Sequence, residues 1–140
     1  MSKLSECFFA KLRGSQEVPP VQTDAFGMAK FKVSNDETRM GFRLTVNDLC
    51  NFTQAHIHLG RKGENGPVVA FLFGPVDRDI SVKVAEVDGV ITKEDLVGPL
   101  AGKPLSKLLH CMRVGEAYVN CHTVQYPDGE IRGQIQKLRD

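Results

Sequence analysis

Apolar and polar residues alternate along two segments near the end of the chain, 118–123 and 129–135. The apolar positions share one side of the alternation: Val119, Cys121, Ile131 and Ile135. The polar positions share the other: Asn120, His122, Glu130, Arg132 and Gln134. A period of two is typical of a strand with one buried face. Residues 125–129 contain proline and an Asp-Gly pair, which favour a turn, so the pattern predicts a β-hairpin with a histidine on its polar face.

The same period of two recurs earlier in the chain. It predicts strands at residues 7–12, 26–33, 40–46, 52–59 and 80–84. The continuous apolar run 68–73 predicts a more buried strand. Residues 87–90 have the composition of a turn, and the paired prolines Pro19 and Pro20 indicate an extended connection rather than a strand interior.

The period changes only between residues 92 and 113. Thr92 and Asp95 have the spacing of a capping box, which predicts a short helical turn. Apolar residues then recur every three or four positions, at Leu105, Leu108, Leu109 and Met112. This spacing predicts an amphipathic helix that begins at Pro104 and ends at Gly115.

About eight short strands with one helical insertion predict an all-β protein, and we expect an antiparallel β-sandwich of Greek-key type. We expect one domain over 1–140, with its core at about 8–136 and the helical insertion at about 92–113. The predicted inward-facing residues are Phe31, Phe42, Leu44, Ile57, Val69, Val119 and Ile131.

Composition narrows the class of protein. A length of 140 residues, 41% hydrophobic and 25% charged, is that of an ordinary globular domain. Lys and Arg number 18 against 17 Asp and Glu, so we expect no nucleic-acid partner, and no apolar run is long enough to predict a membrane span. The N-terminus has no apolar signal core, so we expect the chain as given to be cytoplasmic, and extracellular if a leader was removed.

The four cysteines, Cys7, Cys50, Cys111 and Cys121, have no C-x-x-C spacing. Without a secretion signal, we expect free thiols that behave as small hydrophobic side chains. The sequence does not fix their redox state.

Three histidines are the strongest candidates for chemistry. His56 and His58 are two residues apart on a predicted strand, so both rings project from one face, about 7 Å apart at the backbone. His122 lies on the polar face of its own strand, and if the strands are neighbours the three rings can reach one ion. Three histidines suit zinc or copper, with Asn120, Glu130 and Arg132 as residues that hold the rings or form a polar network beside them.

A second interpretation keeps these histidines in an internal hydrogen-bond network and makes the protein an interaction module for an unknown protein or small ligand. The pattern alone does not decide between the two. We also expect Glu130 and Arg132 either to pair with each other or to cap neighbouring strands. The glycine-rich loop 60–66 leads into a strand and therefore is no P-loop. No catalytic triad or cofactor motif is visible, so the sequence favours a non-enzymatic role and leaves catalysis at the histidines open.

Five motifs, in order along the chain, resemble the CHRD domain family: 14–21 (GSQEVPPV), 55–58 (AHIH), 65–69 (NGPVV), 118–123 (YVNCHT) and 129–135 (GEIRGQI). The resemblance covers nearly the whole chain and implies, at most, a binding role. The H-x-H pair with a later strand histidine is also similar to the copper site of copper/zinc superoxide dismutase. This second likeness favours an immunoglobulin-like or dismutase-like sandwich, and it does not imply dismutase activity because the remaining ligands have no counterparts.

Overall fold

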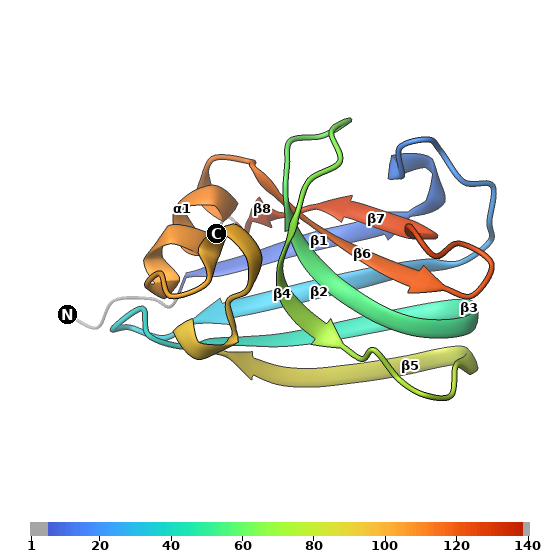
Figure 1. The fold of residues 1–140 in the computed structure, drawn as a ribbon, viewed down its shortest axis with the longest axis horizontal. Coiled ribbons are helices and arrows are strands. Elements are labelled where there is room, and N and C mark those ends of the chain that lie inside the picture. The colour runs from blue at the N-terminus through green and yellow to red at the C-terminus, as the bar shows by residue number, and fades with distance from the viewer. Residues whose placement is uncertain (1–5, 139–140) are drawn as a thin grey trace.

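The computed structural model describes residues 6–138 and shows the alternating segments as antiparallel strands with one short helix (Figure 1). The strands in this part of the chain are β1 (Cys7–Arg13), β2 (Phe26–Val33), β3 (Met40–Leu59), β4 (Val68–Phe73), β5 (Ile80–Ile91), β6 (Ala117–Thr123), β7 (Ile131–Gln134) and β8 (Gln136–Lys137). Three 3₁₀ turns and one helix complete it: η1 (Gly14–Gln16), η2 (Lys93–Asp95), η3 (Gly98–Leu100) and α1 (Leu105–Arg113).

Five of the strands close into a barrel. The order β2–β1–β7–β6–β3 returns to its start because β3 also pairs with β2, while β4 and β5 extend the sheet from β3, and β8 pairs with β1. The expected sandwich is therefore wrong, although the all-β antiparallel class is confirmed. The cause is the length of β3, whose first half pairs with β2 and whose second half pairs with β6, so that the sheet curls onto itself.

Two predicted strand boundaries are also wrong. Segments 40–46 and 52–59 form one strand, because Asp48 and Asn51 adopt positive φ angles of 54° and 58° and the chain passes through the irregularity without leaving the sheet. The predicted turn at 87–90 lies inside β5. Gly89 there pairs with Phe42, and a Cβ at residue 89 would lie 2.6 Å from carbons of the Phe42 ring. The glycine thus makes room for a ring instead of turning the chain.

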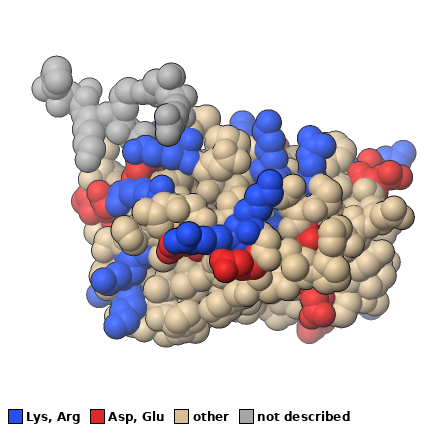
Figure 2. All heavy atoms as spheres, turned by 90° about the horizontal axis from the view of Figure 1, so that it is seen from above, with Lys and Arg blue, Asp and Glu red and all other residues tan. Residues whose placement is uncertain are grey.

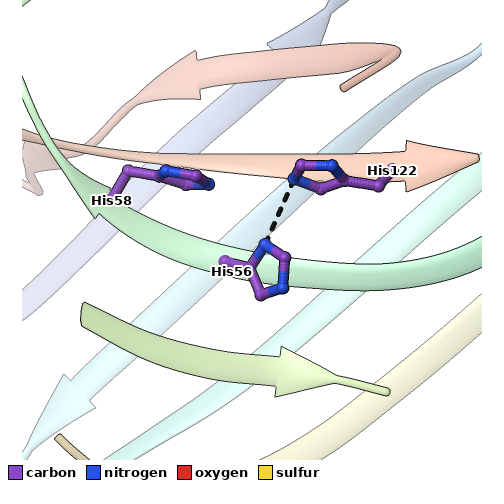
Figure 3. A group of neighbouring side chains, drawn as sticks. All are labelled: His56, His58 and His122. Atoms are coloured by element: carbon purple, nitrogen blue, oxygen red, sulfur yellow. Dashed lines mark hydrogen bonds between the residues drawn. The ribbon is translucent and has the colours of Figure 1, made fainter. Parts of the chain in front are cut away.

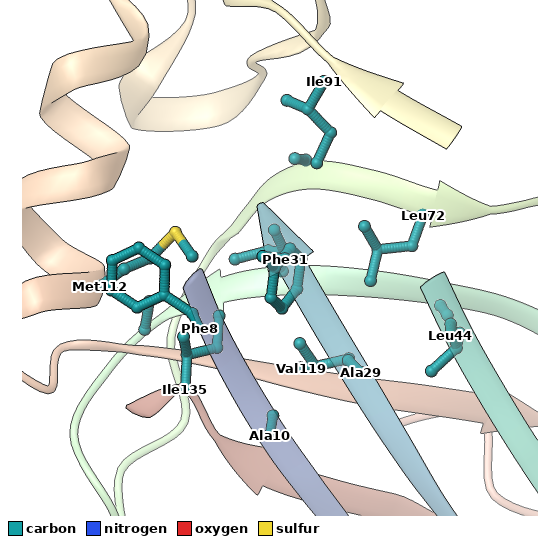
Figure 4. Close-up of a cluster of buried hydrophobic side chains, with 14 of the residues drawn as sticks. Phe8, Ala10, Ala29, Phe31, Leu44, Leu72, Ile91, Met112, Val119 and Ile135 are labelled. Carbon is teal, nitrogen blue, oxygen red and sulfur yellow. The ribbon is translucent and has the colours of Figure 1, made fainter. Parts of the chain in front are cut away.

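One apolar cluster fills the barrel and the space under α1 (Figure 4). Six of the seven predicted inward residues are buried, and Phe42 is half-buried against the cluster. The predicted helical insertion is confirmed. The Asp95 carboxylate accepts a 2.8 Å hydrogen bond from the Thr92 backbone N–H, and α1 buries Leu105, Leu108, Leu109 and Met112.

The hairpin predicted for the end of the chain is formed by β6 and β7, with Val119 opposite Gly133 and Cys121 opposite Ile131. All seven residues of β6 are buried, so its polar face is covered as well as its apolar face. Burial raises the pKa of the Cys121 thiol, and Cys50, Cys111 and Cys121 are free thiols.

The surface carries charges of both signs. Figure 2 shows basic and acidic side chains together on one face of the molecule, with uncharged surface between them. Among residues 6–138, no helix has the length and apolar character needed to cross a bilayer.

Candidate metal centre

The three histidines meet because β3 and β6 are neighbours in the barrel. In their antiparallel register, His58 lies opposite Tyr118, His56 lies opposite Asn120, and His122 lies opposite Gln54. Directly opposed and diagonal residues on one face of such a pair are within side-chain reach. The apolar neighbour Ile57 points into the barrel, so the histidines project from the outer face of the barrel wall.

The imidazole rings converge on one point (Figure 3). One ring nitrogen from each histidine lies within 4.8 Å of the other two. His56 Nδ1 and His122 Nε2 are 3.1 Å apart. The rings are also nearly inaccessible, since the exposed fractions of His56, His58 and His122 are 4%, 7% and 7%. The predicted cluster of three histidines is thus present in the fold.

The far nitrogen of each ring faces a carbonyl oxygen. His58 Nδ1 lies 2.9 Å from Gly66 O, and His122 Nδ1 lies 2.7 Å from Pro127 O. A backbone carbonyl can only accept, so both rings must carry their proton on Nδ1 and direct the Nε2 lone pair at the cluster. His56 Nε2 lies 2.8 Å from Gln54 Oε1, which completes the same arrangement for the third ring.

All three rings are held neutral. Burial lowers the pKa of His56 to about 3, with further lowering by His122 and His58. Burial also lowers the pKa of His58 and of His122, and their hydrogen bonds to Gly66 and Pro127 oppose it only in part. Neutral imidazole is the form that coordinates metal ions.

His58 Nε2 is the one cluster-facing ring nitrogen that takes part in no hydrogen bond among the described residues. It is buried and has no hydrogen-bond partner within residues 6–138. The nearby Asn120 side chain raises the pKa of His58. No group, however, forms a hydrogen bond of ordinary geometry with Nε2. A buried acceptor without a donor costs about 1–3 kcal/mol, which makes this lone pair a candidate position for a ligand.

The three partner residues predicted from the hairpin have different surroundings. Asn120 Oδ1 lies 2.9 Å from His122 Nε2, so Asn120 adjoins the cluster as expected. Glu130 accepts hydrogen bonds from Thr23 and Thr123 and does not pair with Arg132, which corrects one of the two expectations for these side chains.

Arg132 is 1% exposed and ties the loop after β3 to the barrel. Its guanidinium donates to Arg61 O at 3.0 Å, to Glu64 O at 2.6 Å and to Asn65 Oδ1 at 3.1 Å. It also lies 3.5 Å from the centroid of the Tyr118 ring, whose other face stacks on His58. The glycine-rich loop 60–66 is therefore a strand connection, as expected, and it holds the Gly66 carbonyl in place over His58.

Glu17 is a functional candidate that the sequence did not reveal. It follows η1, is 5% exposed, and has a carboxylate oxygen, Oε2, that is buried without a hydrogen-bond partner in the described part of the chain. Burial raises the pKa of Glu17 to about 7, against the lowering effects of Arg132 and of hydrogen bonding from Asn120. Residue 17 belongs to a proline-rich connection, and no local pattern indicates that it folds against a strand a hundred residues later.

The ring nitrogens of the three histidines lie close enough together that they could hold a metal ion. Two bonds of about 2.0–2.1 Å separate their donor atoms by about 3.4 Å at the tetrahedral angle and by about 4 Å in line. The 3.1 Å pair already has a suitable separation, so the wider separations are those to His58. Because nothing is bonded to His58 Nε2, a movement of this ring by about 1 Å closes the set without breaking a hydrogen bond at that atom.

The fold is a five-stranded β-barrel with a covered histidine cluster on its outer wall. Residues 8–135 match the model of the CHRD domain, and the chain belongs to the CHRD domain family. No curated protein and no solved structure gives a significant match to the chain.

Proposed function

We propose that the protein binds one transition-metal ion, zinc or copper, through His56 Nδ1, His58 Nε2 and His122 Nε2. Neutral imidazole suits both metals. The proposal makes the CHRD domain of this chain a metal-binding domain, and it assigns no catalytic reaction.

One observation carries the proposal: the lone pair of His58 Nε2 is fixed, buried and unpaired beside two other ring nitrogens. A backbone carbonyl at 2.9 Å holds the proton on the opposite nitrogen, so Nε2 can only accept a hydrogen bond or coordinate an ion. Ligating histidines in proteins usually donate their other N–H to a carbonyl or carboxylate, and each of these three rings has such a carbonyl partner.

The alternative, a structural network in an interaction module, accounts for part of the geometry. If the Gln54 amide rotates so that its NH₂ donates to His56 Nε2, His56 Nδ1–H can donate to His122 Nε2 across the 3.1 Å gap. This network leaves His58 Nε2 unsatisfied, whereas a metal ion satisfies all three rings.

The test is a titration of tag-free, chelator-treated protein with Zn²⁺ and Cu²⁺, followed by calorimetry and elemental analysis after gel filtration. We expect one ion per chain for the wild type. We expect at least a hundredfold weaker binding for His58→Ala and for His122→Ala, since each removes one of three ligands. His110→Ala is the matched control, because His110 lies on α1 and is exposed. A wild type that binds no metal, or a His110→Ala effect equal to that of His58→Ala, would leave the interaction module as the better account.

A further inference from the structure

We infer that Asn120 Oδ1 is the fourth ligand of this centre and that Glu17 positions it, which makes the centre a three-nitrogen, one-oxygen site for a divalent ion. The inference rests on the proposed metal-binding function and adds to it a fourth ligand, a residue that orients that ligand, and the oxidation state of the bound metal.

Asn120 lies at the edge of the histidine cluster. It stands opposite His56 across the β3–β6 pair, is 2% exposed, and places Oδ1 2.9 Å from His122 Nε2. The His122 ring carries its proton on Nδ1, where it donates to Pro127 O. Two acceptors, a ring lone pair and an amide oxygen, therefore face each other at hydrogen-bond distance. A cation that both atoms coordinate removes this conflict.

The acceptors beside the Asn120 NH₂ group fix the orientation of this amide. Asn120 Nδ2 lies 3.4 Å from Asp128 O, and hydrogen bonding from the same amide lowers the pKa of Glu17. The carbonyl of Asp128 and the carboxylate of Glu17 are both acceptors, so the NH₂ group belongs on their side. Rotating the amide by 180° would set its oxygen against both of them. Asn120 Oδ1 consequently points at the histidines.

Glu17 reaches this amide because residue 129 is glycine. An ideal Cβ at position 129 would collide with Glu17 Oε2 and lie 2.5 Å from Asn120 Nδ2. The carboxylate and the amide thus occupy one small space between the η1 loop and the β6–β7 hairpin. Gly129 has a φ of +126°, a conformation that also favours glycine.

Charge supports the same assignment. A divalent ion would add two positive charges close to Arg132, a buried cation that already lowers the pKa of His58. Of the two carboxylates beside the hairpin, Glu130 accepts hydrogen bonds from Thr23, Thr123 and Gln125, while Glu17 Oε2 has no partner of ordinary hydrogen-bond geometry among the described residues. Glu17 is the one whose carboxylate lies beside the Asn120 amide, and that amide lowers its pKa.

An amide oxygen is a hard ligand. Hard oxygen donors favour divalent ions over Cu⁺, which prefers soft sulfur ligands and imidazole. Three imidazoles and one amide oxygen therefore suit Zn²⁺ or Cu²⁺, and Co²⁺ is a spectroscopic substitute for Zn²⁺ in such a set.

The test compares Asn120→Ala, Asn120→Asp, Glu17→Gln and the control Glu130→Gln, each by Zn²⁺ affinity and by the visible spectrum of the Co²⁺ form. Altering a group that supports a metal ligand typically costs 10–100-fold in affinity. Because Asn120 is the ligand itself, we expect a loss of at least that size for Asn120→Ala, together with an altered Co²⁺ spectrum, and recovery of both in Asn120→Asp, which restores an oxygen ligand.

Glu17→Gln should weaken binding by the same range, because the amide NH₂ that this substitution introduces can donate to Asn120 Oδ1 and hold the Asn120 amide in the rotated orientation. Glu130→Gln should leave affinity and spectrum unchanged. Circular dichroism checks the fold of each variant; if Asn120→Ala does not fold, Asn120→Asp and Glu17→Gln carry the test. Wild-type affinity and spectrum in Asn120→Ala, or equal losses in Glu17→Gln and Glu130→Gln, would overturn the inference and leave the three-histidine site intact. Absence of binding by the wild type would instead overturn the proposed function itself.

Discussion

His122 Nε2 lies 3.1 Å from His56 Nδ1, although the Pro127 carbonyl already holds the proton of the His122 ring on its other nitrogen. The contact is therefore either a hydrogen bond that His56 donates or a pair of lone pairs that share a cation. The surroundings of His58 Nε2 favour the shared cation. This nitrogen lies near the other two ring nitrogens and has no hydrogen-bond donor among the described residues.

The protonation of the rings can be measured directly. Long-range ¹H–¹⁵N spectra of metal-free protein should show His58 and His122 as Nδ1–H tautomers, since backbone carbonyls accept from both. The pKa of His56 is about 3, so its ring should remain neutral throughout a titration from pH 8 to pH 5. A His56 ring that becomes protonated near its ordinary pKa of 6.5 would contradict the buried geometry.

The lowered pKa values of the histidines also predict how the stability of the fold changes in acid. A histidine whose folded pKa is depressed contributes stability above its unfolded pKa of 6.5, and this contribution is lost as the pH falls toward the folded value. We expect the free energy of unfolding to decrease as the pH is lowered from 6.5. Each buried histidine should contribute a decrease of up to about 1.4 kcal/mol per pH unit. Urea unfolding at several pH values checks this.

Glu17 predicts the opposite trend. Its folded pKa, about 7, is raised above the ordinary value of 4.5, so its contribution is fully present below pH 4.5 and is lost as the pH rises to 7. The free energy of unfolding of the wild type minus that of Glu17→Gln should therefore decrease by about 3 kcal/mol between about pH 4.5 and pH 7.5 in metal-free protein. The histidine contributions cancel in this difference. A difference independent of pH would show that Glu17 ionises normally.

Gly129 should tolerate no side chain. Alanine there would meet both a positive φ of 126° and the atoms of Glu17 and Asn120. Gly102 is the matched control, since its φ is +77° but a Cβ would have nothing within 4 Å. Thermal or urea unfolding should give a loss of about 1 kcal/mol for Gly102→Ala and a further loss of about 1–3 kcal/mol for Gly129→Ala. Equal losses would mean that the close approach at residue 129 costs nothing.

Arg132 should be a strong stabilising residue of the loop 60–66. Arg132→Met leaves three loop oxygens without their donor, and we expect a loss of about 3 kcal/mol or more and faster amide exchange across this loop. Arg61→Met is the control, because the Arg61–Glu116 ion pair is exposed and should contribute less than about 1 kcal/mol. Unchanged exchange in the loop would show that Arg132 does not secure it.

Alternation along the strands was sufficient to predict much of the site. It placed His56 and His58 on one face and Ile57 on the other, because a strand has a period of two and the burial of Ile57 determines the register. It also predicted the β6–β7 hairpin, since the turn chemistry of 125–129 lies between two amphipathic segments.

Closure of the barrel was not predictable in the same way. Whether β2 pairs with β1 alone or with β3 as well depends on long-range pairing, and Asp48 and Asn51 resemble loop residues although they lie within β3. The role of Glu17 was hidden for a related reason. Its surroundings come from Asn120 and Gly129, which are distant in sequence, and a carboxylate in a proline-rich connection carries no periodic signal.

The most direct test of the account is anomalous diffraction from crystals of Zn²⁺-loaded protein, measured on both sides of the zinc edge. We predict one anomalous peak per chain, about 2.0–2.1 Å from His56 Nδ1, His58 Nε2 and His122 Nε2. A fully loaded crystal with no peak among these three rings, or with its peak beside the exposed His110, would contradict the metal centre.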